Sequence, residues 1–390
     1  MCSEIGDGLH SAPVYDENGK YYFINGNNLV NSKIIVNETE TKRVSEETFK
    51  KNNKNLDDTT ILLSINGTIG NLAYYNDEMV MLGKSAAYLK VMNIEKKFLY
   101  TSLQTSNTIN SFMSSLTGTT IKNLGLEAIK KTQIFMPCEK EQTAIGKYFQ
   151  NLDNLITLHQ RKYESLVNIK KAMLEKMFPK NEEVVPELRF AGFTDTWEQR
   201  KLGEIADYKK GPFGSALKKE IFVPKSENSV KVYEQQNAIG KNWKLERYFI
   251  TKEYANELKA FETHGGDILV SCAGTIGEMY ELPDNSEVGV INQALMRVRV
   301  NEKIISKELY KLLFTNMIDD FSKEHSNGSA MKNIPPFADL KAMNAMLPTL
   351  DEQERIGAYF NKLDHLITLH QRELEKLQNI KKSCLEKMFI

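Results

Sequence analysis

The sequence predicts an α+β fold in which two globular units of mixed strands and helices are separated by two long repeated helices. These helices are expected to pair as an antiparallel coiled coil with pseudo-two-fold symmetry. A 38-residue segment occurs twice, at residues 141–178 and 352–389, with 26 of the 38 positions identical, so a duplicated gene segment is its economical origin. A globular stretch precedes each copy, and a second, fainter repeat relates the two globular stretches.

The chain divides into four predicted pieces. Short Val, Ile, Tyr and Phe runs broken by Gly and Asn turns, such as YYFINGNN and ILVSCAGTIGE, are typical of short strands and hairpins mixed with a few helices. Pro137 and Pro179 flank the first long helix, and Pro348 precedes the second. We expect a first globular domain over 1–140, a first long helix over 141–179, a connector and second globular domain over 180–350, and a second long helix over 351–390.

Apolar residues recur every seven positions along both helices, which indicates a coiled-coil pair. Each helix should be about 57 Å long at about 1.5 Å per residue. Because a globular domain lies between the two copies, an antiparallel pair is the simplest closure, and it makes the helices a spacer of fixed length. His159 and His370 share one seam position, where a polar layer that fixes register is favoured over a metal or catalytic site. The seam positions are Ile145, Leu152, His159, Leu166 and Met173, echoed by Ile356, Leu363, His370, Leu377 and Cys384.

Composition excludes several classes of protein. Hydrophobic residues make up 41% and charged residues 26% of the chain, as in ordinary globular proteins. No stretch approaches the roughly 18 uninterrupted apolar residues of a membrane span, and the N-terminal residues do not resemble a signal peptide. No CxxC pair occurs, so neither a disulfide framework nor a structural zinc site is expected, and a reducing cytoplasm is the expected location. The cysteines are Cys2, Cys138, Cys272 and Cys384.

The 51 basic and 51 acidic side chains cancel, which by itself argues against a nucleic-acid partner. Binding depends on where the charge lies, however, and residues 209–259 hold eleven Lys or Arg against six Glu. The strongest candidate for nucleic-acid contact is KKGPFGSALKK, whose lysines would neutralise phosphates, with a solvated surface as the alternative. The first unit offers GDGLHSAP at the corresponding place, without the lysines. The candidate residues are Lys209, Lys210, Gly211, Phe213, Gly214, Ser215, Lys218 and Lys219, with His10 and Ser11 in the first unit.

The fainter repeat aligns Leu63–Gly70 with Val270–Gly277, and both segments carry a Gly-Thr-Ile-Gly loop after a predicted strand. Such loops suit close approach to a phosphate, with backbone N–H groups and a threonine hydroxyl as donors. Because Gly-Thr turns are common in hairpins, the motif alone is weak evidence for binding. Its presence at equivalent places in both globular units is what favours a shared binding use. The paired candidates are Gly67 and Thr68 with Gly274 and Thr275, Lys122 with Lys332, and Asn28 with Asn237.

In their order and duplication these features resemble the specificity subunit of a type I restriction-modification enzyme, over almost the whole chain. The resemblance implies two target-recognition domains without a catalytic centre, which read a bipartite, asymmetric site in double-stranded DNA with one domain per half-site. It also implies two methyltransferase subunits and further restriction subunits as partners. S-adenosylmethionine, ATP and magnesium are then expected on those partners, and no cofactor or metal on this chain. The strings that carry the resemblance are LRFAGFTDTWEQRKLGEIA, the GPFGS turn, the strand-then-GTIG elements and the helix entries PCEKEQTAIGKYF and PTLDEQERIGAYF.

Side chains that read bases are expected at groove edges, where amides and cations distinguish one base from another. Ordinary turn residues are the alternative for the same positions. One departure from the family pattern concerns residues 188–202, which precede the second domain and have no counterpart before the first. Either the first domain lacks this opening element or an upstream start exists. The candidate base readers are Gln235, Gln236 and Asn237, with Asn25, Asn27 and Asn28 in the first domain.

Two other functions stay open at the level of sequence. One is a self-contained DNA methyltransferase or nuclease with a cryptic site, although Gly83-Lys84-Ser85 lacks the earlier glycine of an ATP-hydrolysing P-loop. The other is a coiled-coil adaptor without DNA binding. Steep weakening of binding with rising salt would separate a phosphate-binding subunit from such an adaptor.

Overall fold

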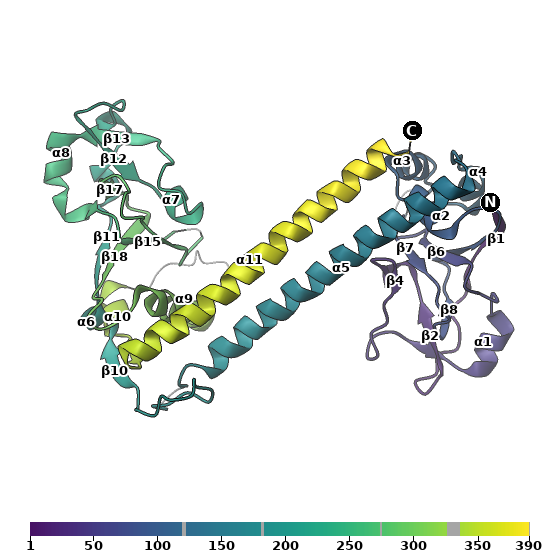
Figure 1. The fold of residues 1–390 in the computed structure, drawn as a ribbon, viewed down its shortest axis with the longest axis horizontal. Coiled ribbons are helices and arrows are strands. Elements are labelled where there is room, and N and C mark those ends of the chain that lie inside the picture. The colour runs from purple at the N-terminus through teal and green to yellow at the C-terminus, as the bar shows by residue number, and fades with distance from the viewer. Residues whose placement is uncertain (119–121, 181–182, 274, 326–335, 390) are drawn as a thin grey trace. The chain divides into compact units, whose positions relative to one another are not determined.

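The structure is a computed structural model (Figure 1), which describes residues 1–118, 122–180, 183–273, 275–325 and 336–389, without the side chains of 319–325. The chain folds into two compact units, Met1–Ser165 with Ile367–Ile390, and Leu166–Leu366. Each unit therefore contains one globular domain together with a part of each long helix. None of the helices in the described part of the chain combines the length and the apolar content that a membrane span requires.

A four-stranded antiparallel sheet forms the centre of the first domain. Alternate side chains of its strand Thr60–Ser64 face opposite sides of the sheet: Ile61 and Leu63 pack in a core with three helices, whereas Leu62 packs in a separate core with a smaller sheet. The strand order is β1 (Cys2–Asp7), β9 (Ala86–Val91), β6 (Thr60–Ser64) and β7 (Leu72–Tyr74). The helices are α2 (Lys96–Ser102), α3 (Ser106–Ser114) and α4 (Leu126–Lys131).

The smaller sheet of this domain covers the face of the central sheet that the helices leave free. Ile24 and Leu82 from the smaller sheet share a core with Leu62 of the central one. The layers are therefore helices, central sheet and small sheet. The small sheet has the order β5 (Arg43–Val44), β2 (Tyr21–Ile24) and β8 (Val80–Leu82), with β2 and β8 parallel. Also present are η1 (Gly26–Asn28), β3 (Leu29–Val30), β4 (Lys33–Ile34) and α1 (Glu46–Asn52).

The second domain repeats this plan, with one strand more in its second sheet. Its central sheet has the order β11, β18, β15 and β16, and its second sheet the order β13, β12, β17 and β14, again with one parallel pair, between β12 and β17. Val270 and Leu269 lie in different cores on the two faces of the central sheet. The strands are β11 (Ala206–Lys210), β12 (Ser229–Tyr233), β13 (Tyr248–Thr251), β14 (Glu262–Thr263), β15 (Ile268–Ser271), β16 (Met279–Glu281), β17 (Gly289–Ile291) and β18 (Leu295–Val300).

The second unit also has one addition, an antiparallel pair formed by β10 (Glu198–Lys201) and β19 (Asn344–Leu347). Its helices are α6 (Leu202–Ile205), α7 (Gln235–Ile239), α8 (Lys252–Glu257), α9 (Lys307–His325) and α10 (Phe337–Ala342), with 3-10 helices η2 (Gly214–Ala216), η3 (Lys219–Ile221) and η4 (Lys259–Phe261). The two long helices, of 38 residues each, are α5 (Glu139–Lys176) and α11 (Leu350–Lys387).

The long helices run antiparallel. In the first unit, Asp153 of α5 forms an ion pair with Lys381 of α11 at 2.7 Å. In the second unit, Lys170 of α5 pairs with Asp364 of α11 at 2.6 Å. Partner numbers thus fall along α11 as they rise along α5, and the duplication makes the two ion pairs equivalent. The predicted fold class, two α+β domains with an antiparallel coiled-coil pair of repeated helices, is confirmed.

His159 and His370 face each other across the helix seam. Their Nδ1 atoms lie 3.1 Å apart, so one imidazole donates a hydrogen bond and the other accepts it. Partial burial and the neighbouring His159 and Lys162 lower the pKa of His370. Protonating both rings would remove the acceptor and place two positive charges in contact, so this layer is stable only while one ring stays neutral.

We predict that the stability of the helix pair decreases as the pH falls through the ordinary histidine pKa of 6.5. Because folding lowers the pKa of His370, the unfolded chain binds more protons than the folded chain in this range, and acid therefore favours unfolding. His370→Gln should flatten the pH dependence of the melting temperature, measured by circular dichroism between about pH 5 and pH 8. His365→Gln, which alters an exposed histidine on the same helix, should leave it unchanged. An equal slope in both variants would contradict this account.

Candidate nucleic-acid interface

In the second domain, strand ends bring four loops to one place. The N–H of Gly211, after β11, donates to the first carbonyl of β18 at 2.9 Å. The N–H of Asn292, in the turn between β17 and β18, donates to the last carbonyl of β12 at 3.0 Å. The side-chain amide of Gln235, after β12, donates to the Ser271 hydroxyl at the end of β15 at 2.8 Å. These bonds hold the four loops as one cluster.

The first domain builds the same cluster from equivalent positions. The N–H of Gly8 donates to the first carbonyl of β9 at 3.2 Å, as Gly211 does to that of β18. The Thr68 hydroxyl, in the loop after β6, donates to the side-chain oxygen of Asn27 after β2 at 3.3 Å. GDGLHSAP and the GPFGS turn therefore occupy corresponding places in the two domains, with different side chains on the same frame.

Close backbone approach explains two of the glycines. A Cβ atom on Gly211 would collide with the carbonyl of Asn292, and one on Gly8 would collide with the carbonyl of Leu82. A Cβ on Gly214 would meet only the side-chain amide of Gln293, at 3.9 Å. Gly8 and Gly211 are thus needed for packing of the loops, whereas Gly214 lies in open space where a ligand could approach.

The turn over residues 209–219 presents exposed basic and aromatic side chains. Phe213 is 89% exposed, and Lys218 and Lys219 are exposed and form no ion pair within the described residues. Lys209 lies with its Nζ atom 5.0 Å from the ring centre of Phe261, which orients it by a cation–π contact. A cavity of about 910 Å³ opens beside this turn; Lys210, Gly211, Gly214 and Ser215 line it with Phe213 and Gln293.

The last glycines of the two Gly-Thr-Ile-Gly segments make equivalent hydrogen bonds. The N–H of Gly70 donates to the Ser64 carbonyl at 2.9 Å, and that of Gly277 to the Ser271 carbonyl at 3.0 Å. Both glycines have left-handed φ angles, 93° and 82°, which favour glycine. Burial raises the pKa of the Cys272 thiol, next to this loop, to about 12, so it stays uncharged at neutral pH. Of the predicted contacts, Gly67, Thr68 and Thr275 are exposed, and Gly274 lies outside the described residues.

Asn28 and Asn237 hold their own loops together. The side-chain oxygen of Asn237 accepts from the N–H of Glu234 at 2.8 Å, and its amide donates to the Leu245 carbonyl at 2.9 Å. Asn28 accepts from the N–H of Asn25 at 2.9 Å and donates to a downstream carbonyl in the same way. Asn27 and Gln236, which directly precede Asn28 and Asn237, are exposed. Asn25 accepts from the Ser85 hydroxyl at 2.9 Å.

Three other predicted residues, His10, Ser11 and Lys122, lie near the clusters and are exposed. His10 and Ser11 are exposed, and His10 lies 2.8 Å from the carboxylate of Asp7. Lys122 is exposed beside Asn123, which bridges to the Gly-Thr loop through Asn66. Lys332 lies outside the described residues. Within those residues no group of three or more His, Cys, Asp and Glu side chains could hold a metal ion.

Two exposed residues of the clusters were missed by the sequence analysis. Lys84 and Gln293 stand at equivalent turns, before β9 and before β18. Lys84 entered the sequence analysis only as part of Gly83-Lys84-Ser85, an incomplete P-loop. Aligning the globular repeats at the offset of 209 that relates Asn28 to Asn237 would have paired Lys84 with Gln293 and placed both beside the predicted loops.

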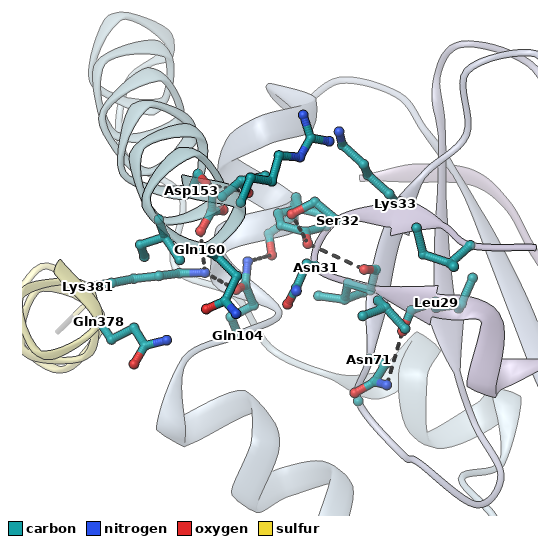
Figure 2. Close-up of a pocket in the computed structure, with 18 of the residues that line it drawn as sticks. Leu29, Asn31, Ser32, Lys33, Asn71, Gln104, Asp153, Gln160, Gln378 and Lys381 are labelled. Carbon is teal, nitrogen blue, oxygen red and sulfur yellow. Dashed lines mark hydrogen bonds and ion pairs between the residues drawn. The ribbon is translucent and has the colours of Figure 1, made fainter. Parts of the chain in front are cut away.

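A polar cavity of about 700 Å³ lies elsewhere in the first unit, between the β3–β4 turn and the two long helices (Figure 2). Lys381 bridges Asp153 and Gln104, at 2.7 Å from each. The Tyr100 hydroxyl donates to Ser32 in the turn at 2.9 Å. None of the predicted contact residues lines this cavity. Its polar side chains connect the globular domain to the helices.

Comparison with known proteins gives a consistent result. The family described as "Type I restriction modification DNA specificity domain" matches residues 8–168 and 194–379, once in each half. The type I restriction enzyme MjaVIII specificity subunit of Methanocaldococcus jannaschii is 27% identical over 326 residues, which cover 78% of this chain and 74% of that protein. The putative MjaX specificity subunit of the same organism is 23% identical over 264 residues, covering 66% and 58%.

Two solved structures share the fold. The S subunit of the type I restriction-modification system from M. genitalium superposes with a TM-score of 0.61 at 18% identity, covering 99% of this chain and 93% of that one. A chain from a study of complex assembly and conformational transition in the type I system gives 0.51 at 15% identity, covering 99% and 97%.

A duplicated frame that carries two exposed loop clusters defines a two-domain recognition subunit. With the family match over most of its length, the chain belongs to the type I restriction modification DNA specificity family. It is a DNA specificity subunit and not a catalytic one. The self-contained enzyme and the coiled-coil adaptor find no support in these comparisons.

We predict that Gly211→Ala destabilises the chain by about 1–3 kcal/mol, because the added methyl group must displace the Asn292 backbone. Gly214→Ala, three residues further along the same turn, should stay within about 0.5 kcal/mol of the natural protein, since its Cβ enters open space. Thermal and urea unfolding measure both. Equal losses in the two variants would mean that the turn tolerates no side chain at all and that the close approach is not the cause.

Proposed function

We propose that the chain reads a bipartite, asymmetric site in double-stranded DNA, with one domain on each half-site. The observation that carries this proposal is the presence of the same loop cluster twice, with different exposed side chains. Phe213, Gln236 and Gln293 occupy the second cluster where His10, Asn27 and Lys84 occupy the first. A common frame with different contact groups gives two different half-site sequences and hence an asymmetric target.

Within each cluster the contacts divide by chemistry. Lys218 and Lys219, exposed and free of ion pairs in the described structure, suit phosphates, as do the N–H groups around the Gly-Thr loops. Gln236 and Gln293, and Asn27 in the first domain, are exposed amides that can form bidentate hydrogen bonds to adenine edges. Asn28 and Asn237 act in this proposal by holding the loops in place.

The long helices set the unread gap between the half-sites in this proposal. Their pairing is fixed at the Asp153–Lys381 and Lys170–Asp364 ion pairs and at the histidine layer. A helix pair held in one register converts residue number into a defined length. DNA-binding dimers set their half-site spacing by geometry in the same way.

The partners in this proposal are two methyltransferase subunits and further restriction subunits in the cytoplasm. The helices present identical LITLHQR segments, in which Leu155, Leu158 and Leu369 are exposed apolar side chains. A surface that occurs twice with the same residues suits two copies of one partner. S-adenosylmethionine for adenine N6 methylation, and ATP with magnesium for translocation and cleavage, belong to those partners and not to this chain.

Charge reversal tests the phosphate contacts. Lys218→Glu with Lys219→Glu should weaken DNA binding by the complex with its methyltransferase partner and flatten the slope of log K against log salt by about 0.9 for each phosphate that is no longer neutralised. The matched control is Lys252→Glu with Lys303→Glu. Both lysines are exposed, lie in the same domain and come after the C-terminal ends of β13 and β18, whereas the loop cluster includes the turn before β18. Fluorescence anisotropy across a salt series measures both. Identical slopes in the two double variants would remove this turn from the interface.

Helix length tests the spacer. Insertion of one heptad at matched positions in α5 and α11, after Lys162 and Glu373, preserves the seam and lengthens each helix by about 10 Å. The gap between the recognised half-sites should then grow by about 3 base pairs at about 3.4 Å each. Mapping of methylated adenines in cells with either form measures the gap. Methylation of the original site by the lengthened form would contradict the spacer role, and insertion in one helix only should abolish methylation.

A further inference from the structure

A basic loop, residues 240–247, connects α7 to β13 in the second domain (Figure 1). Its three cations are exposed and form no ion pair in the ranges that the structure describes. Its one carboxylate, Glu246, lies 2.6 Å from the ammonium of Lys225, outside the loop. The basic loop therefore presents three positive charges that no carboxylate of its own neutralises. The cations are Lys241, Lys244 and Arg247.

Two side chains from the domain hold the main chain of the basic loop. The Asn237 amide donates to the carbonyl of Asn242 at 3.0 Å and to that of Leu245 at 2.9 Å. The ammonium of Lys231 donates to the Trp243 carbonyl, which lies between these two in sequence. Three carbonyl groups of the loop are thus fixed by the domain. Because the loop is held before any ligand binds, it has little conformational freedom to lose on binding.

Lys231 is a buried cation for which no carboxylate partner occurs among the residues that the structure describes. Its Nζ atom lies 4.8 Å from the ring centre of Tyr233 and 5.8 Å from that of Trp243. These cation–π contacts stabilise the charged form, whereas burial lowers the pKa of Lys231. Because its ammonium contacts the main chain of the basic loop, it adds to the positive potential there.

The basic loop begins one short helix away from a proposed base reader. Helix α7 carries Gln236, and the loop follows directly after its last residue, Ile239. The five residues of α7 span about 7.5 Å at about 1.5 Å per residue. Along one DNA strand, successive phosphates are about 3.4 Å apart. The cations of the loop are therefore placed to reach phosphates about two or three nucleotides from a base that Gln236 contacts.

The corresponding turn of the first domain carries less charge. Asn28 closes it by donating to a downstream carbonyl at 2.8 Å, but its one cation is Lys33. At the offset of 209, the place of Lys231 is taken by Tyr22, whose hydroxyl accepts from the Arg43 guanidinium at 2.7 Å. The asparagine that holds the loop is thus common to both domains, whereas the three exposed cations and the buried lysine belong to the second.

We infer that the basic loop binds DNA phosphates beside the half-site of the second domain, an inference that rests on the proposed function. Lys241, Lys244 and Arg247 contact the phosphates, while Asn237 and Lys231 hold the loop that carries them. Contacts of this kind position a domain on the duplex and add affinity without reading bases. Binding at the half-site of the second domain therefore depends more steeply on salt than binding at the other half-site.

The test uses the full-length chain in complex with its methyltransferase partner. A loop variant that combines Lys241→Gln, Lys244→Gln and Arg247→Gln should flatten the slope of log K against log salt by about 0.9 for each phosphate contact that it removes. Its affinity should fall by the same factor for duplexes with and without the recognised site, because phosphate contacts carry no sequence information. Fluorescence anisotropy across a salt series measures both quantities.

The matched control combines Lys201→Gln, Lys252→Gln and Lys303→Gln, three exposed lysines of the same unit, and should keep the natural slope. Equal flattening in the control and the loop variant would overturn the inference. A natural slope in the loop variant, together with a flattened slope in Lys218→Glu with Lys219→Glu, would overturn the inference and leave the proposed function intact. Natural slopes in both of these variants would count against the proposed function as well.

Ethylation interference locates the contacts on the DNA. In the natural complex, ethylation of phosphates beside one of the two half-sites should reduce binding, and the loop variant should lose this sensitivity there and keep it elsewhere. The same interference pattern in the natural and variant complexes would overturn the inference. Failure of the loop variant to assemble with the methyltransferase subunit, measured by sedimentation velocity, would overturn it in favour of an acidic protein surface as the ligand of the basic loop.

Discussion

The structure depends on the packing of each long helix against the end of the other. In the first unit, the final turns of α11 complete a core with the start of α5, and in the second unit the end of α5 does the same for the start of α11. One core in each unit therefore combines residues from both halves of the sequence. To the first unit, α11 and the residues directly after it contribute Leu377, Ile380, Cys384, Leu385 and Phe389; to the second, α5 and the residues directly after it contribute Leu166, Met173, Leu174, Met177 and Phe178.

This constraint explains which parts of the duplicated sequence stayed alike. A helix that packs both on a domain and on its partner keeps most of its seam, here four of the five paired positions with Met173 and Cys384 as the exception, since a change of a buried side chain tends to leave a void or a clash. Loops at strand ends are free of that requirement as long as a few groups hold them. Gly8 and Gly211, with Asn28 and Asn237, are such groups, and the side chains between them differ between the domains. A recognition subunit needs this combination of a constant frame and variable contacts.

The two halves differ in the surroundings of one repeated residue. Glu352 and Glu141 occupy the same place in the repeat, yet one is buried under Arg189 and the other is exposed. A carboxylate can be buried only with a partner that replaces its hydration. The difference between these two identical residues therefore follows from the connector, Leu188–Lys201, and not from the helix that carries them.

The fold class, the repeated helices and their antiparallel pairing could be predicted from the amino-acid sequence, because a heptad seam and a duplication can be recognised before the fold is known. Of the residues that the sequence analysis selected, Lys218, Lys219, Thr68 and Thr275 are exposed, and their contacts with DNA stay a prediction. That Asn237 holds its loop in place, and that Lys84 and Gln293 belong to the clusters, became apparent only in the folded chain, because main-chain hydrogen bonds between distant strand ends set these positions. Burial of Glu352 likewise arose from a contact across 163 residues, which no local pattern encodes.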